Sequence, residues 1–291
     1  LNWGLDNISA DPCFIDPGYW DSNDLWVEGD YHLHLDSPCI DGADPDYIPE
    51  DGETDIDGDQ RGIGGRVDIG ADEYRDNHIL VPSEYPTIQA AIDVAFNGDT
   101  IVVLPGIHTG DGNRDIDFKG KPITVRSIAP NDPNVVAATI IDCNGTQSDP
   151  HRGFYFHSQE DAASVLKGLT IINGYAPLEE LGGYMYSIGG AILCLENSSP
   201  TISKCMFVGN MAENGLGGVM YNDSNSSPGL TNCMFTGNSA DVGGGMFNYS
   251  SNPVLINCIF SGNWADDGGG TFNDYSNPIL INCTFSGNYA D

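Results

Sequence analysis

The second half of the chain repeats one pattern of apolar and polar positions. Short runs rich in Leu, Ile, Val and Phe are separated by Pro, Asn and Gly, and none has the 3.6-residue period of a helix. A unit containing a Cys and a Phe two residues later recurs in steps of 28, 25 and 25 residues, at Cys205, Cys233, Cys258 and Cys283. A unit this short cannot bury a core alone, so the units must stack on one another.

Each unit is interpreted as one coil of a parallel β-solenoid, which makes the fold class all-β. Three short strands per coil of about 25 residues are expected. In one unit they lie at 244–248, 254–256 and 258–261, and the next unit repeats them at 269–273, 279–281 and 283–286. Stacking coils about 4.8 Å apart places equivalent residues on top of one another.

Equivalent residues of stacked coils are expected to form columns. Each Cys shares a strand face with the Phe two residues later, which predicts internal columns of both. The Asn before each of the last three Cys is expected to take the left-handed conformation, which bends the chain, and to bond through its amide from coil to coil. The predicted ladders are Cys205, Cys233, Cys258 and Cys283; Phe207, Phe235, Phe260 and Phe285; and Asn232, Asn257 and Asn282.

Two of these columns leave alternatives open. The cysteines are either small buried hydrophobes, which the neighbouring Phe favours, or reactive thiols for metal or redox chemistry. The coil spacing is too long for disulfides along the column. Tyr221, Phe247 and Phe272 form a second row, which is either part of the core or an exposed aromatic row on one strand face.

A capping helix is predicted before the repeats. Ile88, Ala91, Ile92 and Ala95 follow helical spacing between Pro86 and a glycine at 98. A short amphipathic helix near 87–96 would cover the first coil and protect the open end of the stack.

The charge of the chain is strongly negative, with 42 acidic against 10 basic residues and a net charge of −32. Such a surface repels nucleic acid and anionic membranes, so no nucleic-acid partner is expected. No apolar run approaches about 20 residues, so no membrane span is expected. The acids either attract divalent cations or form a solvated surface.

A calcium loop is the best candidate for a metal site. Asp55, Asp57 and Asp59 alternate beside a turn-forming Gly, as oxygen-ligand loops require, and Asp68 could supply a later ligand. The pattern departs from the EF-hand loop at its sixth position, which is Gln60, and at its twelfth, which is Arg66. The alternative is an acidic surface turn without a cofactor.

Several segments resemble the right-handed β-helix repeat proteins of the pectin-lyase-like superfamily. YPTIQAAIDVAFNGDTIVVLPGIHTG, TIIDCNG and DPHRGFYFHS resemble the N-terminal part of that family, and the GGG…SNP…NC.FSGN coils resemble its repeats. GDYHLHLDSPCIDGADPD and DIDGDQRGIGGRVDIGADEY resemble the tail that follows a last coil. The expected organisation is a tail-like segment at 1–75, a cap with first coils at 76–167, and repeated coils with an open C-terminal edge at 168–291.

The residues for family chemistry are scarce in the repeats. Family lyases act on polyuronates with Arg or Lys and bound calcium, as the resemblance implies, but residues 168–291 contain no Arg, no His and only Lys204 as a base. Asp241, Asp266 and Asp291 share one repeat position and could supply a carboxylate pair; splayed or cation-bridged carboxylates are the preferred interpretation. His32 with His34, and His151 to His157, are interpreted as structural.

The function predicted from these features is that of an extracellular or cell-surface structural protein. Copies of the module would stack end to end in a filament, surface layer or large adhesin, because an open solenoid end is a template for addition. The alternative is a carbohydrate-binding or carbohydrate-cleaving β-helix with a polysaccharide partner.

Overall fold

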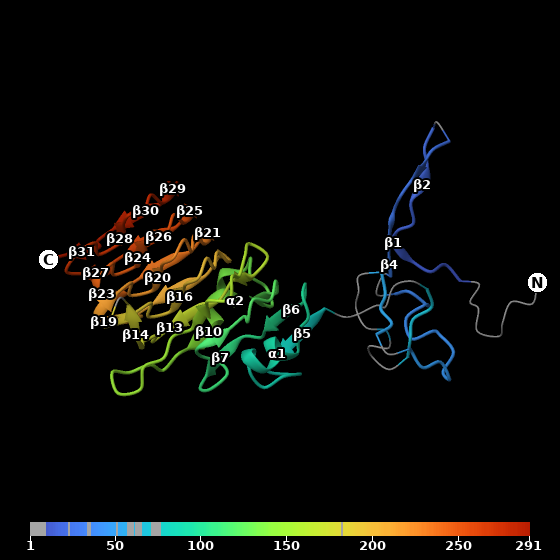
Figure 1. The fold of residues 1–291 in the computed structure, drawn as a ribbon, viewed down its shortest axis with the longest axis horizontal. Helices are drawn as coiled ribbons and strands as arrows, with labels where there is room; N and C mark the ends of the chain where they lie inside the picture. Colours follow the sequence, from blue (N-terminus) through green and yellow to red (C-terminus); the bar gives the residue numbers. More distant parts are fainter. Residues whose placement is uncertain are drawn as a thin grey trace, which may run out of the picture. The chain divides into compact units, whose positions relative to one another are not determined.

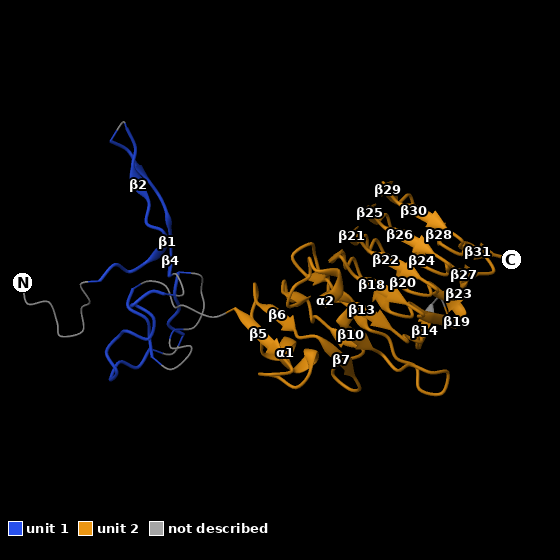
Figure 2. Cartoon of the chain, turned by 180° about the vertical axis from the view of Figure 1, so that it is seen from behind, with its two compact units in different colours: residues 1–76 blue, residues 77–291 orange. Residues whose placement is uncertain are grey.

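The computed structural model describes residues 10–22, 24–33, 36–50, 52–56, 61, 66–70, 77–181 and 183–291. The chain divides into two compact units, Leu1–Asp76 and Asn77–Asp291 (Figure 2). Each unit is described by itself.

The described residues of unit 1 include four short strands that form one long hairpin. β1 (Phe14–Asp16) pairs antiparallel with β4 (Asp30–Leu33), and β2 (Tyr19–Trp20) pairs antiparallel with β3 (Trp26–Val27). Among the described residues of this unit, Leu33, Cys39 and Val67 are buried apolar residues. Gly18, at φ +72°, lets the chain leave β1 and enter β2, because the left-handed region favours glycine.

Unit 2 is a parallel β-helix, whose coils follow one another along the chain (Figure 1). Three of its sheets are entirely parallel. The Leu sheet has eight strands: β5 (His78–Val81), β6 (Thr100–Val103), β9 (Thr124–Ser127), β12 (Val165–Lys167), β17 (Thr201–Ser203), β21 (Gly229–Thr231), β25 (Val254–Ile256) and β29 (Ile279–Ile281).

The other two parallel sheets complete the three sides that the repeat predicted. The Phe sheet has seven strands: β7 (Gly106–Thr109), β10 (Thr139–Asp142), β13 (Thr170–Ile172), β18 (Met206–Val208), β22 (Met234–Thr236), β26 (Ile259–Ser261) and β30 (Thr284–Ser286). The Asn sheet has six: β8 (Ile116–Asp117), β11 (Phe154–Phe156), β16 (Ile192–Cys194), β20 (Met220–Asn222), β24 (Met246–Tyr249) and β28 (Thr271–Asp274).

A fourth sheet was not predicted from the sequence. It has six strands: β14 (Leu178–Leu181), β15 (Tyr184–Ile188), β19 (Met211–Leu216), β23 (Ser239–Val242), β27 (Trp264–Ala265) and β31 (Tyr289–Ala290). β14 and β15 form an antiparallel hairpin, and the later strands pair in parallel. These strands are short and carry small inward residues such as Ala212 and Ala240, so they lack the apolar run that marks a strand.

The first strand of each repeat also begins later than predicted. The strand expected at 244–248 is β24, which starts at Met246. A side chain at Gly244 or Gly245 would clash with main-chain oxygens of the next coil, at 2.6 Å and 2.4 Å from Gly269 and Gly270. These glycines therefore form a tight corner, where coils approach through their backbones.

The capping helix lies where the sequence predicted it. α1 (Ile88–Val94) begins after Thr87, whose hydroxyl accepts a hydrogen bond from the Ala90 N–H at 3.2 Å. Ile88, Ala91 and Ile92 are completely buried and join the core of the first coils. A second short helix, α2 (Pro133–Ala138), precedes β10 and was not predicted.

Candidate functional site

The predicted Cys and Phe positions lie in register along the coils. In the Phe sheet, equivalent residues of successive coils pair directly: Met206 with Met234, Met234 with Ile259, and Ile259 with Thr284. The Cys before each and the Phe after each therefore form columns. Phe235 and Phe260 stack with ring centroids 4.3 Å apart, and Phe260 and Phe285 with centroids 4.8 Å apart. The first three members of each column are buried.

The cysteines behave as apolar residues in this environment. All eight, each of which lies among the described residues, are free thiols. Burial raises the pKa of the Cys205 thiol to about 12 and that of Cys233 well above its usual range. Thiols held protonated in this way are poor nucleophiles and poor metal ligands.

The predicted Asn ladder runs along the outside of the coils. Asn232, Asn257 and Asn282 have φ values of 55°, 55° and 51°, which is the left-handed region. The Asn257 amide donates to the Asn232 side-chain oxygen at 3.1 Å, and Asn282 donates to Asn257 at 2.7 Å. Each Asn thus turns the chain between the Leu sheet and the Phe sheet and bonds to its neighbour.

Sequence reasoning missed two further Asn ladders, both largely buried. Asn238 accepts from the Asn210 N–H at 2.9 Å, and its amide donates to the Phe207 carbonyl at 3.1 Å and to the Asn263 side-chain oxygen at 2.8 Å. The second ladder joins Asn222, Asn248 and Asn273 by hydrogen bonds between their side-chain amides, at 2.8 Å and 2.7 Å. The available signal was the repeat position itself, since a Gly-Asn pair closes the third predicted strand of each unit.

The aromatic row lies in a second apolar cluster, outside the coil interior. Tyr221 and Phe247 are buried with Ile188 and Leu193, while the adjacent Met220 and Met246 point into the main core. The rings of Tyr221 and Phe247, and of Phe247 and Phe272, stack with centroids 5.4 Å apart and planes within 11°. Their faces cover one another, so they offer no flat surface to a sugar.

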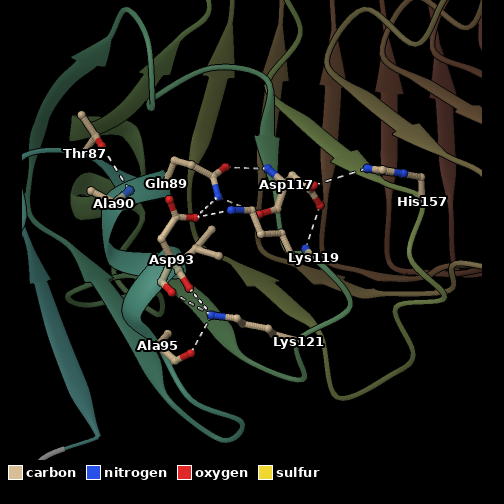
Figure 3. Close-up of polar contacts among 10 residues, drawn as sticks. Thr87, Gln89, Ala90, Asp93, Ala95, Asp117, Lys119, Lys121 and His157 are labelled. Atoms are coloured by element: carbon tan, nitrogen blue, oxygen red, sulfur yellow. Dashed lines mark hydrogen bonds and ion pairs between the residues drawn. The ribbon is translucent and has the colours of Figure 1, made fainter.

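A network of charged side chains holds the cap on the first coils (Figure 3). Lys121 donates to the carbonyls of Ile92 and Ala95 at 2.7 Å each, which satisfies the end of α1. Lys119 pairs with Asp93 at 2.7 Å, and this bond lowers the pKa of the Asp93 carboxyl. The Gln89 side chain bonds to both the N–H and the carbonyl of Asp117, at 2.9 Å and 3.1 Å.

The histidines and Arg152 belong to a neighbouring network. The buried Arg152 donates to Glu179 of β14 at 3.0 Å and lies 5.2 Å from the Tyr155 ring centre. Burial lowers the pKa of Arg152, which the nearby Glu179 opposes. His151 pairs with Asp115 at 2.5 Å, and His157 with Asp117 at 3.4 Å. Arg152 thus has an opposite charge as its partner, and its bonds to Glu179 and to the Ile188 carbonyl tie the β14–β15 hairpin to the coil.

The carboxylates at the shared repeat position remain on the surface. The Asp266 N–H donates to the Asp241 carbonyl at 2.9 Å, and the side chains of Asp266 and Asp291 are exposed. Within the described ranges, no three His, Cys, Asp or Glu side chains are placed to hold a metal ion. No catalytic group is assigned to this position.

The predicted calcium residues are only partly described. Asp57 and Asp59 lie outside the described residues, as does His34. Asp68 is buried and accepts a hydrogen bond from the Asp41 N–H at 2.6 Å, so one of its oxygens fixes a turn of unit 1. Calcium binding by Asp55, Asp57, Asp59 and Asp68 stays a prediction.

The last coil exposes side chains that its predecessor buries. Leu280 and Phe285 are 46% and 43% exposed, whereas Leu255 and Phe260, one coil earlier, are completely buried. Four strands, β28, β29, β30 and β31, are the edges of the four sheets (Figure 1). In the coil before, Asn257 and Gly262 donate their N–H groups forward to Ile281 and Ser286 at 2.9 Å and 3.0 Å. The equivalent N–H groups of Asn282 and Gly287 lie on this edge.

The repeated coils match a known family. Residues 184–291 match the family described as right handed beta helix region. These coils are a right-handed β-helix. The match and the parallel sheets confirm the fold class and the β-helix resemblance expected from the sequence.

Other comparisons add little about the right-handed β-helix. A pectin methylesterase from Aspergillus niger is similar at 13% identity, with 75% of this chain and 88% of that chain covered and a TM-score of 0.33. A likeness this low supports no argument about activity. No curated protein sequence matches the chain. Within the described residues, no helix is both long and apolar enough to cross a membrane.

Proposed function

We propose that this protein is a structural β-solenoid module of the cell surface or extracellular space, which extends by stacking a further coil on the edge formed by β28, β29, β30 and β31. The observation that carries the proposal is the register of the coils: Leu280 and Phe285 pair with Leu255 and Phe260, which are completely buried beneath them. The forward-facing N–H groups of Asn282 and Gly287 mark where the main chain of that coil would bond.

The two ends of the coil stack differ, and this limits how copies can join. α1 covers the first coil with the buried Ile88, Ala91 and Ile92. A filament built head to tail from separate chains would require α1 to leave that position and expose these residues to water, which is unfavourable. Extension therefore proceeds from the C-terminal edge, while α1 terminates the other end.

The carbohydrate-cleaving alternative has less support in the repeats. Burial keeps the Cys205 and Cys233 thiols protonated, the aromatic row is covered, and Lys204 is the only basic residue after position 168. A polyuronate would meet a surface of its own sign.

The test lengthens the chain by one coil. Residues 267–291 span one 25-residue repeat, so a second copy appended after Asp291 continues the register. The expected result is a higher melting temperature than the parent, because Leu280 and Phe285 become interior and each interface adds stability. A control chain carries the same 25 residues in scrambled order. Equal melting temperatures for the two extended chains would refute the stacking proposal.

A second measurement asks whether the edge also joins separate chains. Because α1 covers the other end, sedimentation and electron microscopy of the full chain are expected to show pairs joined through two C-terminal edges, and the fraction of pairs should grow with concentration. Leu280→Lys should reduce it by placing a charge on the edge, whereas Ile259→Lys changes a side position in the coil before. Association that is equal in both variants, or particles of one length throughout, would restrict the module to stacking within one chain.

A further inference from the structure

The hairpin of unit 1 presents aromatic rings to solvent. We call strands β1 to β4 the aromatic hairpin. Tyr19, Trp20 and Trp26 are 59%, 67% and 44% exposed. The two indoles lie edge to face, with centroids 5.5 Å apart and planes at 67°. Large exposed rings gathered on one element commonly mark a binding surface.

The position of Trp26 is fixed by its surroundings. Its indole N–H donates to the Tyr31 hydroxyl at 3.2 Å, and Tyr31 packs edge to face on Phe14 with centroids 5.6 Å apart. The ring also lies against the main chain at Gly18, where an added Cβ would stand 2.7 Å from Trp26 Cζ2. The indole is therefore held in place before any ligand arrives, which lowers the entropy lost on binding.

These rings differ from those of the coils in what covers them. Tyr221, Phe247 and Phe272 stack face to face, so their faces are unavailable. Trp20 and Trp26 meet edge to face and remain exposed, so part of each ring face is open to a flat apolar surface. A pyranose ring offers such a surface, because its axial C–H groups form an apolar face.

The charges around the rings narrow the class of ligand. Asp16, Asp24, Glu28 and Asp30 are exposed on or beside the same strands, and no Lys or Arg occurs before Arg61. A polyanion would be repelled. The core of a protein interface is also disfavoured, because it excludes charged residues whose desolvation is not compensated. Sugar hydroxyls, in contrast, donate hydrogen bonds to carboxylates.

We infer that the aromatic hairpin binds an uncharged polysaccharide, whose pyranose rings lie against Trp20 and Trp26 while its hydroxyls donate to flanking carboxylates. This site lies in unit 1 and is independent of coil stacking. It gives the module a partner that the repeats themselves do not recognise.

The test is affinity electrophoresis of the full chain through gels that contain soluble neutral polysaccharides, namely galactomannan, xyloglucan or mixed-linkage β-glucan. Retention by at least one of them is expected. Trp20→Ala and Trp26→Ala should each weaken binding about tenfold, which corresponds to the loss of about 1.4 kcal/mol of ring stacking. Leu25→Ala is the matched control, because Leu25 is 65% exposed on the same hairpin but has no ring. It should change binding less than about twofold.

Two comparison polymers distinguish other ligand classes. Polygalacturonate should not retard the chain, because both carry negative charge. Poly-lysine will bind the acidic surface, and that binding should be equal in the Trp20→Ala and Leu25→Ala variants. The inference is overturned if no neutral polysaccharide retards the chain, or if the Trp variants bind as well as Leu25→Ala. It is also overturned if only poly-lysine binding depends on Trp20, which would make the hairpin a cation site.

Discussion

At the scale of single residues, amides in register hold the coils together alongside the apolar columns. In the ladder from Asn210 to Asn288, each side chain lies between two coils. There it bonds to main-chain N–H and carbonyl groups that would otherwise lack a partner at the corner of the coil. The Asn232 to Asn282 ladder bonds in the same direction but lies at the surface, where water competes for the amides. Loss of an amide from the buried ladder should therefore lower the free energy of unfolding more than loss of one from the exposed ladder.

Substitutions in the two ladders test this difference. Asn238→Ala removes the partners of the Asn210 N–H and the Phe207 carbonyl and should lower the free energy of unfolding by about 2–4 kcal/mol. Asn257→Gly removes an exposed amide but keeps the left-handed conformation, and should cost about 0.5–1 kcal/mol. Urea denaturation of both variants measures the difference. Equal losses would contradict a special role for the buried ladder.

The Arg152–Glu179 pair makes a second residue-scale prediction. Glu179→Gln leaves the buried guanidinium without its counter-charge and should destabilise the protein by about 1–3 kcal/mol, since Glu179 is itself partly exposed. The double variant Arg152→Met with Glu179→Gln should recover part of that loss, because no uncompensated charge then remains. Thermal unfolding of the two single variants and the double variant gives the coupling; simple additivity would argue against a paired role.

The calcium prediction also belongs to this scale. If Asp55, Asp57 and Asp59 bind calcium, about 5 mM Ca²⁺ should raise the melting temperature more than the same concentration of Mg²⁺. Asp57→Asn should remove the difference, whereas Asp241→Asn, at a coil position, should keep it. An identical response to both cations would make the loop an acidic turn.

At the scale of elements, α1 is held by both its apolar face and the charges at its end. Ile88, Ala91 and Ile92 supply buried area, and Lys121 satisfies the carbonyls that the last turn leaves open. Asp93 joins the helix to Lys119 of the coil beneath. The helix thus closes the stack by the same two means, apolar burial and satisfied main-chain groups, that a further coil would use.

The cap should weaken in acid through Asp93. Its pKa is lowered in the folded protein by the bond to Lys119, so its contribution is present above the ordinary value of 3.8 and is lost as the pH falls below it. Asp93→Asn should therefore be less stable than the parent at pH 6, and the two should converge near pH 2–3. Melting temperatures of both proteins across this range give the comparison, and a constant difference would exclude the pairing as its source.

At the scale of the whole molecule, the net charge of −32 works against the compact fold. Carboxylates repeat along the coils, as at Asp241, Asp266 and Asp291, and few bases oppose them. Like charges at coil spacing repel one another unless salt screens them. The surface thus favours solubility at the expense of stability.

Salt should stabilise the protein for this reason. Raising NaCl from about 0.01 M to about 0.15 M shortens the screening length from about 30 Å to about 8 Å. The melting temperature should rise by several degrees, and sucrose at equal osmolality should not reproduce the rise. A melting temperature that is unchanged or lower in salt would mean that attractive pairs such as Lys119 with Asp93 outweigh the repulsion.

The sequence by itself determined the coil, because a solenoid is built from local repeats whose contacts fall one period apart. The 25-residue step, the Cys and Phe columns, the left-handed Asn232, Asn257 and Asn282, and the position of α1 all follow from spacing and residue type.

Tertiary structure decided features without a local pattern. The fourth sheet depends on corners of Gly244 and Gly245 that bring backbones together. Tyr221 and Phe247 are buried in a cluster that includes Ile188 of the β14–β15 hairpin, which Arg152 contacts from another coil. The Asn ladder that includes Asn238 points into the coil and is buried, whereas the ladder of Asn232, Asn257 and Asn282 points outward. The sequence of one repeat does not say which of the two is buried.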